Sequence, residues 1–242
     1  MAEYHLPAGP AELLETARQT IGKYLGGEHH LRLGGGTALA ARWGHRHSTD
    51  VDLFVTPRAF KGLFEHRDAF RRELYAMVAE PASIHVNEGF AKIVVGKTGD
   101  EISIDTSEPR TASPRSDDTV RGTNIPLETN GEILAKKIRY RMLGNAEIVP
   151  RDLYDIAVSR RLDPGALKTA LEGIDTPQLE DINNELHYLR PDFMGHGRQK
   201  RLIRPVYPED AADAVAIVRR QFQQEIDSRT PRPYRPPPAW ER

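Results

Sequence analysis

Residues 30–55 read HLRLGGGTALAARWGHRHSTDVDLFV, with strand-like and helix-like patterns on either side of a glycine run. A short apolar run, His30 to Leu33, predicts a strand that leads directly into Gly34-Gly35-Gly36-Thr37. Thr37 to Trp43 has the composition of a short helix, and Val51 to Val55 predicts a second strand. Glycines between a strand and a helix let the backbone approach a phosphate closely, and the free N–H groups at the helix start favour an anion.

The glycine run alone is a weak signal, because a glycine run at such a place is most often only a tight turn. No Gly-Lys-Ser/Thr follows it, so it is not a Walker A loop, and it does not fit G-x-G-x-x-G. Gly35, Gly36 and Thr37 become candidate nucleotide-binding residues only together with the residues that follow.

The motif Asp50-Val51-Asp52 strengthens the nucleotide-binding interpretation of the glycine run. Residues two apart in a strand face the same side, so both carboxylates project together while Val51 and Leu53 point into the core. Two like charges on one face repel each other unless a cation bridges them, and Mg²⁺ prefers such oxygen ligands. The sequence therefore predicts a metal site at Asp50 and Asp52; a solvated strand edge carrying two acids is the alternative.

Three further residues extend this candidate site. Ile102-Ser103-Ile104-Asp105 places a third acid, Asp105, in an alternating strand, although an acid that merely ends a strand is the other interpretation. Arg46 and Ser48 directly precede the strand that carries Asp50, where they could contact phosphates or brace the acids.

Outward from this stretch, the first half mixes helices and strands. Helical spacing covers Pro10 to Leu25 and Arg58 to Val78, and strands are predicted at Ala82–Val86, Ala91–Val95 and Glu101–Asp105. The last two strands flank Lys97-Thr98-Gly99-Asp100, which predicts a hairpin. Residues 1–125 are therefore expected to form a mixed-sheet domain of the α/β (α+β) class, with its boundary in the polar stretch Thr106 to Thr123.

The second half predicts a helical domain over residues 126–229. The expected helices, separated by prolines, are Glu128–Leu143, Arg151–Arg161, Pro164–Glu172, Pro177–Tyr188 and Glu209–Ile226. Residues 230–242 contain five prolines and predict an extended or disordered tail.

Composition narrows the function classes. The 242 residues contain no cysteine, which excludes disulfides, thiolate metal sites and cysteine nucleophiles. No apolar run is long enough for a transmembrane helix, and we expect a cytoplasmic protein without membrane contact.

The net charge of −1 argues against binding nucleic acid by bulk charge, although a local patch is allowed. The nine histidines show no convincing metal-binding spacing and are expected at the surface or in hydrogen bonds.

A glycine turn followed after a thirteen-residue spacer by Asp-x-Asp resembles the polymerase-β-like nucleotidyltransferases. Leu33-Gly-Gly-Gly-Thr-Ala-Leu39 and Arg46-His-Ser-Thr-Asp-Val-Asp-Leu-Phe54 resemble, more narrowly, the AbiEii/AbiGii toxin family. A second block agrees, Ile133-Leu-Ala-Lys-Lys-Ile-Arg-Tyr-Arg141 followed by Arg151-Asp-Leu-Tyr-Asp155. The resemblance covers roughly residues 10–162.

The resemblance implies a fold and an activity: an enzyme that transfers an NMP from an NTP with the help of Mg²⁺. It implies that a lysine-bearing helix and a later Arg/Lys-Asp-x-x-Asp helix complete the site. Members are often toxins of bacterial toxin–antitoxin or phage-defence pairs, which implies a cognate antitoxin protein. Some resemble enzymes that add nucleotides to tRNA 3′ ends.

In the second block, Lys136 and Lys137 are adjacent, so only one is expected to point into a cleft. We favour Lys137 as a catalytic, triphosphate-binding cation, because Leu134, Ile138 and Arg141 lie on the same helical side, but Lys136 stays open. Asp152 and Asp155 share a helix face and could reach the lysine or the substrate. Asp155 is assigned a catalytic role and Asp152 a nucleotide-binding role.

The expected acceptor is structured RNA, and tRNA in particular. Residues 136–161 contain seven basic and three acidic side chains, and a further basic run comprises Arg198, Lys200, Arg201 and Arg204. Solvated helix faces would explain both runs equally simply. A transferase that acts on a small-molecule or protein hydroxyl is the alternative, and a non-catalytic nucleotide- or RNA-binding scaffold is the alternative of a different class.

Overall fold

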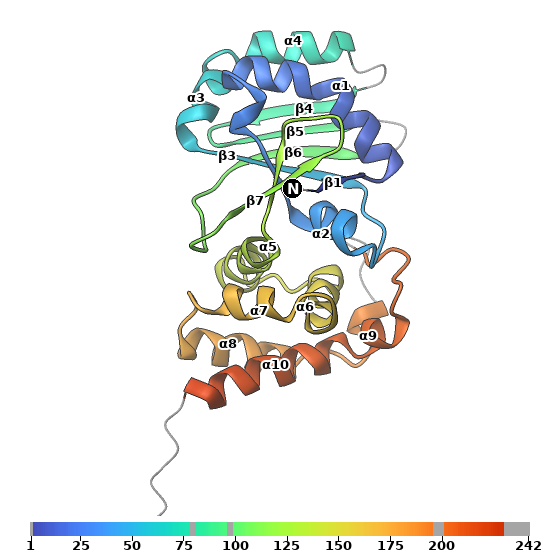
Figure 1. Cartoon of the computed structure of the whole chain (residues 1–242), viewed down its shortest axis with the longest axis vertical. Coiled ribbons are helices and arrows are strands. Elements are labelled where there is room, and N and C mark those ends of the chain that lie inside the picture. Colours follow the sequence, from blue (N-terminus) through green and yellow to red (C-terminus); the bar gives the residue numbers. More distant parts are fainter. Residues whose placement is uncertain (1, 78–80, 96–98, 196–200, 230–242) are drawn as a thin grey trace, which may run out of the picture.

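A computed structural model describes residues 2–77, 81–95, 99–195 and 201–229, and it divides into a sheet half and a helical half (Figure 1). The sheet has eight strands in the order β1-β7-β8-β2-β3-β6-β5-β4. Parallel and antiparallel pairs both occur, so the expected mixed sheet is confirmed. The strands are β1 (Glu3–Tyr4), β2 (Arg32–Gly34), β3 (Asp50–Val55), β4 (Pro81–Asn87), β5 (Phe90–Val95), β6 (Glu101–Thr106), β7 (Arg115–Val120) and β8 (Pro126–Glu128).

The centre of the sheet brings the sequence motifs together. Strand β3 pairs antiparallel with β2 and parallel with β6, so Asp52 lies opposite Gly34 on one side and Ser103 on the other. Val51, Leu53 and Val55 are buried, whereas the alternate residues of β3 are half-buried on the opposite face. The period of two expected from the sequence is therefore present.

Helices cover the apolar face of the sheet. Helix α1 (Ala8–Leu25) packs beside α3 (Pro57–Glu65) and α4 (Arg67–Met77) above the strands (Figure 1). The single helix predicted from Arg58 to Val78 is wrong, because the chain leaves helical geometry at His66. This break lets two short amphipathic helices each bury their own apolar pair, Phe60 with Leu63 and Phe70 with Leu74. Val78 lies outside the described residues.

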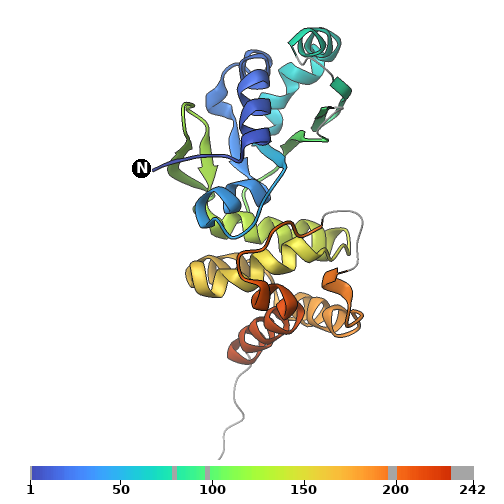
Figure 2. The ribbon, with the colours of Figure 1, turned by 90° about the vertical axis from the view of Figure 1, so that its right-hand side faces the viewer.

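The first helix after the glycine turn starts earlier than predicted. Helix α2 (Gly35–Trp43) begins within the glycine run, and Glu28–His30 forms a short 3₁₀ turn (η1) ahead of β2. Helix α2 lies between the sheet and the helical half in both views (Figures 1 and 2). The first turn of α2 therefore faces the region where the two halves meet.

The polar stretch Thr106 to Thr123 was expected to be a boundary, but it contains strand β7. Only Val120 of this strand is buried, so its side chains give no apolar signal. Backbone pairing with β1 and β8 holds it in the sheet. Because β8 ends at Glu128, the strands continue three residues past the expected boundary at residue 125.

The helical half contains the predicted helices with two refinements. The first helix is α-helical only to Lys136 and continues as a π-helix, and Asp213 separates the last one into two. Prolines occupy first-turn positions, where a missing N–H costs nothing. The elements are α5 (Asn130–Lys136), η2 (Lys137–Gly144), α6 (Pro150–Leu162), α7 (Pro164–Leu171), α8 (Thr176–His187), η3 (Phe193–Gly195), α9 (Pro208–Ala212) and α10 (Ala214–Arg229).

A segment before α9 returns to the sheet half. The backbone N–H of His47 donates to the carbonyl of Ile203 at 3.0 Å, and the N–H of Val206 donates to His45 at 2.8 Å. These bonds tie the segment to the loop that precedes β3. Arg198, Lys200 and the proline-rich residues 230–242 lie outside the described residues, and none of the described helices is long and apolar enough to cross a membrane.

Candidate active site

The glycine turn is shaped for close approach. Gly35 has φ +61°, a conformation that other residues adopt at a cost, and a Cβ there would overlap the carboxylate of Asp52. A Cβ on Gly36 would overlap the guanidinium of Arg46. Glycine is therefore required at both positions of the turn, because the side chains of Asp52 and Arg46 pack directly against its backbone.

Gly35→Ala should lower nucleotidyl transfer at least tenfold, because the new methyl group displaces the Asp52 carboxylate. Gly44→Ala is the matched control, since Gly44 also has positive φ (+59°) but has no atom within 4 Å of an added Cβ. Both variants carry the strain of the left-handed backbone, about 1–2 kcal/mol. Steady-state kinetics beside thermal melts separate the two effects. Equal activity losses in the two variants would contradict the contact with Asp52.

Asp52 and Asp105 face each other across neighbouring strands. The Ser103 hydroxyl lies 3.3 Å from Asp52 Oδ1 and 3.0 Å from Asp105 Oδ2, so it can join the two carboxylates. Burial raises the pKa of Asp105, and the negative charge of Asp52 adds to this effect. Asp52 forms no ion pair with any described residue. Two carboxylates that share one hydroxyl make a centre that a cation would stabilise.

Asp50, unlike Asp52, forms an ion pair with a described residue. Its Oδ2 accepts a hydrogen bond from Arg151 at 2.7 Å, and its Oδ1 accepts one from Thr49 at 3.1 Å. Burial alone would raise the pKa of Asp50, but the hydrogen bond and charge of Arg151 hold it below its usual value. The Arg151 contact crosses from α6 in the helical half to β3.

The donor set fits a magnesium ion bound together with a nucleotide. Within the described residues, no three His, Asp or Glu side chains are gathered closely enough to hold a metal alone. Mg²⁺ is commonly held by one or two carboxylates plus substrate phosphates. Asp52 and Asp105 supply two such carboxylates, and Asp50 lies on the same face of β3. These residues would hold the ion when the triphosphate supplies the remaining oxygens.

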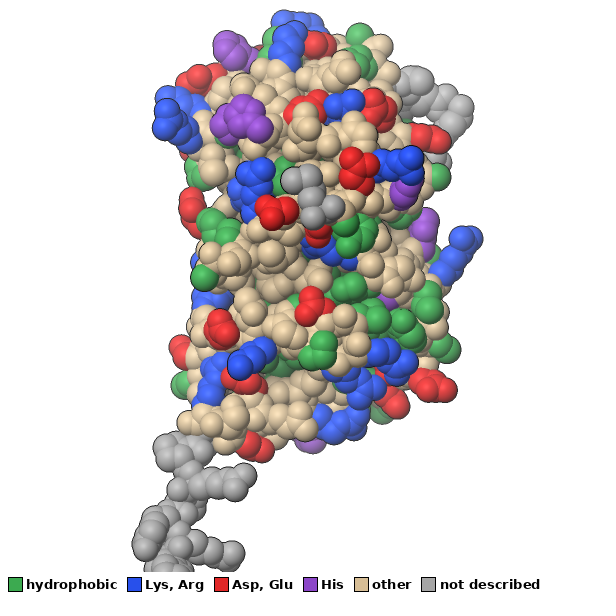
Figure 3. Space-filling view, in the orientation of Figure 1, with side chains coloured by type: hydrophobic (Ala, Val, Ile, Leu, Met, Phe, Trp, Pro, Cys, Tyr) green, Lys and Arg blue, Asp and Glu red, His purple; other side chains and the backbone are tan. Residues whose placement is uncertain are grey.

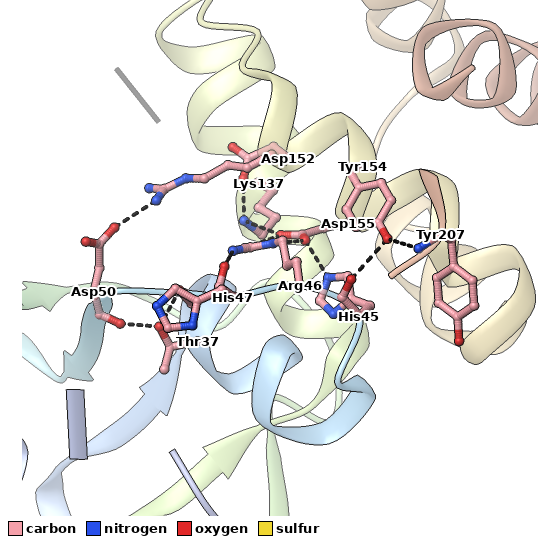
Figure 4. Close-up of polar contacts among 12 residues, drawn as sticks. Thr37, His45, Arg46, His47, Asp50, Lys137, Asp152, Tyr154, Asp155 and Tyr207 are labelled. Carbon is pink, nitrogen blue, oxygen red and sulfur yellow. Dashed lines mark hydrogen bonds and ion pairs between the residues drawn. The ribbon is translucent and has the colours of Figure 1, made fainter. Parts of the chain in front are cut away.

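Asp155 is the centre of a buried charge cluster (Figure 4). It accepts two hydrogen bonds from Arg46, at 2.6 and 2.9 Å, and lies 3.1 Å from the Lys137 ammonium and 2.7 Å from His45 Nε2. Although burial opposes ionisation, Arg46 and Lys137 keep the pKa of Asp155 well below its usual value. The fully buried acid is therefore ionised and holds three side chains in place.

Asp152 continues the cluster one helical turn earlier. It contacts Lys137 and accepts a hydrogen bond from Arg141 at 2.5 Å. Burial works against the charged form, yet Lys137 and Arg141 lower the pKa of Asp152 to about 2. Lys137 is thus held between two ionised aspartates of α6, and its ammonium is oriented before any nucleotide binds.

Lys136 and Lys137 both border the pocket, so the expectation that only one would reach a cleft is wrong. Lys136 donates to Glu128 at 2.6 Å and to Ser107 at 2.8 Å, and its ammonium lies 3.5 Å from the Phe54 ring centroid. Burial lowers the pKa of Lys136 and raises that of Glu128. The two lysines therefore have separate carboxylate partners.

Three of the candidate residues lie behind the pocket rather than in its wall. The hydroxyls of Thr37 and Ser48 are 2.7 Å apart, and Thr37 also bonds the Asp50 carbonyl. The Arg46 guanidinium is occupied by Asp155. Of the two roles open from the sequence, phosphate contact or bracing of the acids, this placement favours bracing.

A pocket of about 550 Å³ connects these groups between the two halves. Acids form part of its wall and cations another part. Its lining includes Gly35, Asp52, Phe54, Pro57, Asp105, Ser107, Arg110, Ile133, Lys136, Lys137, Tyr140, Arg141 and Asn145. Asp50, Gly36, Asp152 and Asp155 are outside the lining. Asp152 and Asp155 contact the lining residue Lys137, and Asp50 lies on the same face of β3 as the lining residue Asp52.

Several residues escaped the sequence interpretation. His45 was grouped with ordinary histidines, but it is fully buried and stacked on Tyr154, with ring centroids 5.6 Å apart. The Tyr154 hydroxyl donates to the His45 carbonyl at 3.0 Å. Ser103 was visible only as a polar residue beside Asp105, and nothing in the sequence linked Arg151 to Asp50.

Carboxylates on adjoining strands that face lysines across a pocket supply the two kinds of group, metal ligands and fixed cations, with which phosphoryl-transfer sites hold a nucleoside triphosphate. Two solved structures from Helicobacter pylori share the fold. One, described as a nucleotidyltransferase, is 15% identical with a TM-score of 0.54 and covers 93% of this chain and 100% of its own. The other, JHP933, is 15% identical with a TM-score of 0.53 and covers 91% of this chain and 95% of its own.

The family is shown by sequence. Residues 25–228 match the family described as nucleotidyl transferase AbiEii toxin, type IV toxin–antitoxin system. The chain therefore belongs to the AbiEii family and is a nucleotidyltransferase, which confirms the resemblance found in the two sequence blocks. A search of curated proteins gave no significant match.

Proposed function

We propose that this enzyme uses Mg²⁺ to transfer an NMP from an NTP to a hydroxyl of structured RNA, at the 3′ end of tRNA. The pocket that joins Asp52 and Asp105 on the sheet to Lys136, Lys137 and Arg141 on the helices carries the proposal. In a cavity with carboxylates on one side and cations on the other, the cations can bind a polyphosphate and the carboxylates can bind its metal ion. The family implies an antitoxin partner protein and an NTP substrate, and we place the reaction in the cytoplasm, where both NTPs and tRNA occur.

Each group of residues has a distinct task. Asp50, Asp52 and Asp105 would hold the magnesium ion, which would supply charge neutralisation for the triphosphate and its pyrophosphate leaving group. The first turn of α2, beginning at Gly35, offers free N–H groups to phosphate oxygens. Lys137 contributes a fixed positive charge to the same triphosphate, while Asp155 and Asp152 keep that ammonium in place.

Lys137→Ala should lower kcat/KM for NTP by at least tenfold, about 1.4 kcal/mol, because a fixed cation at the triphosphate is lost. Its two aspartates keep Arg46 and Arg141 as partners, so the fold should tolerate the change. Lys136→Ala is the matched variant. Among the described residues it leaves buried Glu128 with Arg32, at 3.4 Å, as its one ion-pair partner, and it should lower the melting temperature more than it weakens NTP binding.

Kinetics and thermal melts on both variants check this difference. An NTP-binding defect confined to Lys136→Ala would assign the triphosphate to Lys136 instead.

The RNA proposal rests on the family more than on bulk charge. Of the seven basic residues between 136 and 161, six form ion pairs with acids. Basic and acidic side chains are also interspersed on the face shown in Figure 3. Arg139 is the exception, since it pairs with no acid in the described ranges. Together with exposed Arg110 at the pocket, it offers a local cationic surface for a phosphate backbone.

RNA labelling tests this acceptor. Incubation with each α-labelled NTP, Mg²⁺ and total RNA should label a tRNA-sized species, and labelling should fall steeply with salt because phosphate contacts release counterions. Arg139→Glu should reduce RNA labelling while leaving the Kd for NTP unchanged. Arg141 is a poor choice for this test, because it neutralises buried Asp152. Label on protein or on a small metabolite, with RNA unlabelled, would refute the RNA acceptor.

A further inference from the structure

An aromatic side chain and a guanidinium contact each other in the wall of the pocket. The Arg110 guanidinium lies 4.6 Å from the centroid of the Tyr140 ring, and its Nε donates to the Tyr140 hydroxyl at 2.7 Å. Both residues border the same pocket as Asp52 and Lys137. Arg110 is exposed and forms no ion pair with an acid among the described residues.

The loop that carries Arg110 is fixed by a buried carboxylate. Glu132, on α5, is fully buried and accepts hydrogen bonds from the backbone N–H of Arg110 at 2.9 and 3.0 Å. It accepts two more from the N–H and hydroxyl of Thr111, both at 2.9 Å. Burying a carboxylate is costly unless it is paired and hydrogen-bonded, and here all four hydrogen bonds come from this one loop, while the Lys136 ammonium lies 3.8 Å from Glu132 Oε1. The backbone that carries the exposed Arg110 guanidinium is therefore held in place.

Tyr140 lies close in the sequence to the cation assigned to the triphosphate. It follows Lys137 by three residues in η2, which is less than one turn of a π-helix. Both side chains border the pocket. A nucleotide whose triphosphate meets Lys137 would thus extend its ribose and base along the helix towards Tyr140.

We propose that Tyr140 and Arg110 form the platform on which the base of the incoming nucleoside triphosphate stacks. The inference rests on the proposed function, since it assumes that the triphosphate lies against Lys137. Aromatic rings and guanidinium planes both stack on nucleobases, and such stacking accepts every base because each has a π-face. The platform therefore adds affinity for all four NTPs and does not by itself choose among them.

Calorimetric titration of each NTP and of inorganic tripolyphosphate, all with Mg²⁺, tests the platform. Tyr140→Ala should weaken all four NTPs by about tenfold or more and leave tripolyphosphate unchanged, because tripolyphosphate has no base to stack. Tyr140→Phe should keep most of the affinity. Arg110→Ala should weaken NTPs in the same selective way, and being exposed it remains a valid test if Tyr140→Ala does not fold. Tyr188→Ala, 83% exposed on the helical half, is the control that should change nothing.

The outcomes separate the two proposals. If wild-type protein binds neither NTP nor tripolyphosphate, the proposed function fails. If it binds both, but the Tyr140 and Arg110 variants lose neither ligand or lose both equally, the base platform is wrong. Weaker RNA binding with unchanged NTP binding in these variants would likewise overturn the inference, because the platform would then hold a base of the acceptor.

Discussion

Asp52→Asn should abolish nucleotidyl transfer, with a loss of at least a thousandfold, while the protein stays folded. Asp52 borders the pocket, has no ion-pair partner among the described residues, and shares Ser103 with Asp105. Removing its charge relieves repulsion within the pair, so the free energy of unfolding should hold or rise slightly. Transfer fails because the site loses a carboxylate for the cation. Thermal melts and single-turnover assays measure the two effects separately.

Two further variants sharpen this result. Asp50→Asn should also abolish transfer, but at some cost in stability, because it weakens the hydrogen bond from half-buried Arg151. Asp117→Asn, on the exposed part of β7, should be active and is the charge-matched control. An Asp52→Asn protein that transfers nucleotide normally, or that melts well below wild type, would refute the assignment of Asp52.

Asp155→Asn should destabilise the whole protein. The neutral amide leaves Arg46 and Lys137 buried with a reduced counter-charge and leaves His45 with a weaker partner. Breaking a buried ion pair from one side costs about 3–5 kcal/mol, which corresponds to a fall of about 6–20 °C in melting temperature for a protein of this size. Because Lys137 and the loop before β3 both depend on Asp155, transfer should fall even at temperatures where the variant is folded.

Asp181→Asn, on the exposed side of α8, changes the same chemistry without a buried partner and should melt as wild type. A melting temperature of the Asp155 variant within 2 °C of wild type would show that the cluster adds little to stability.

Local sequence patterns predicted the parts of the fold that depend on local physics. The alternation in Asp50–Val55 placed both acids on one face, and the helical spacing of Pro10–Leu25 matched the end of α1 and missed its start, Ala8, by two residues. The alternation in residues 102–105 placed Asp105 on a strand, as β6 shows. The prediction of one continuous helix over Arg58–Val78 was wrong, because the chain breaks at His66 and nothing in the apolar spacing marks that break.

Contacts between residues far apart in the chain could not be predicted from the sequence. The pairing of Arg151 with Asp50 and of Lys136 with Glu128 depends on how the helical half docks on the sheet. For the same reason the net charge of residues 136–161 was misleading, because acids elsewhere in the chain neutralise most of it. Strand β7 was missed because backbone pairing, rather than apolar side chains, holds it in place.

The position of the label in the NTP distinguishes nucleotidyl transfer from transfer of the terminal phosphate. Wild-type protein is incubated with total RNA, Mg²⁺ and the same NTP carrying the label either on the α- or on the γ-phosphate. Nucleotidyl transfer predicts that the α-label becomes covalently attached to RNA, that the γ-label leaves as pyrophosphate in equal amount, and that Asp52→Asn does neither. Covalent attachment of the γ-label, or α-labelling that survives in Asp52→Asn, would contradict a nucleotidyltransferase site built on Asp52.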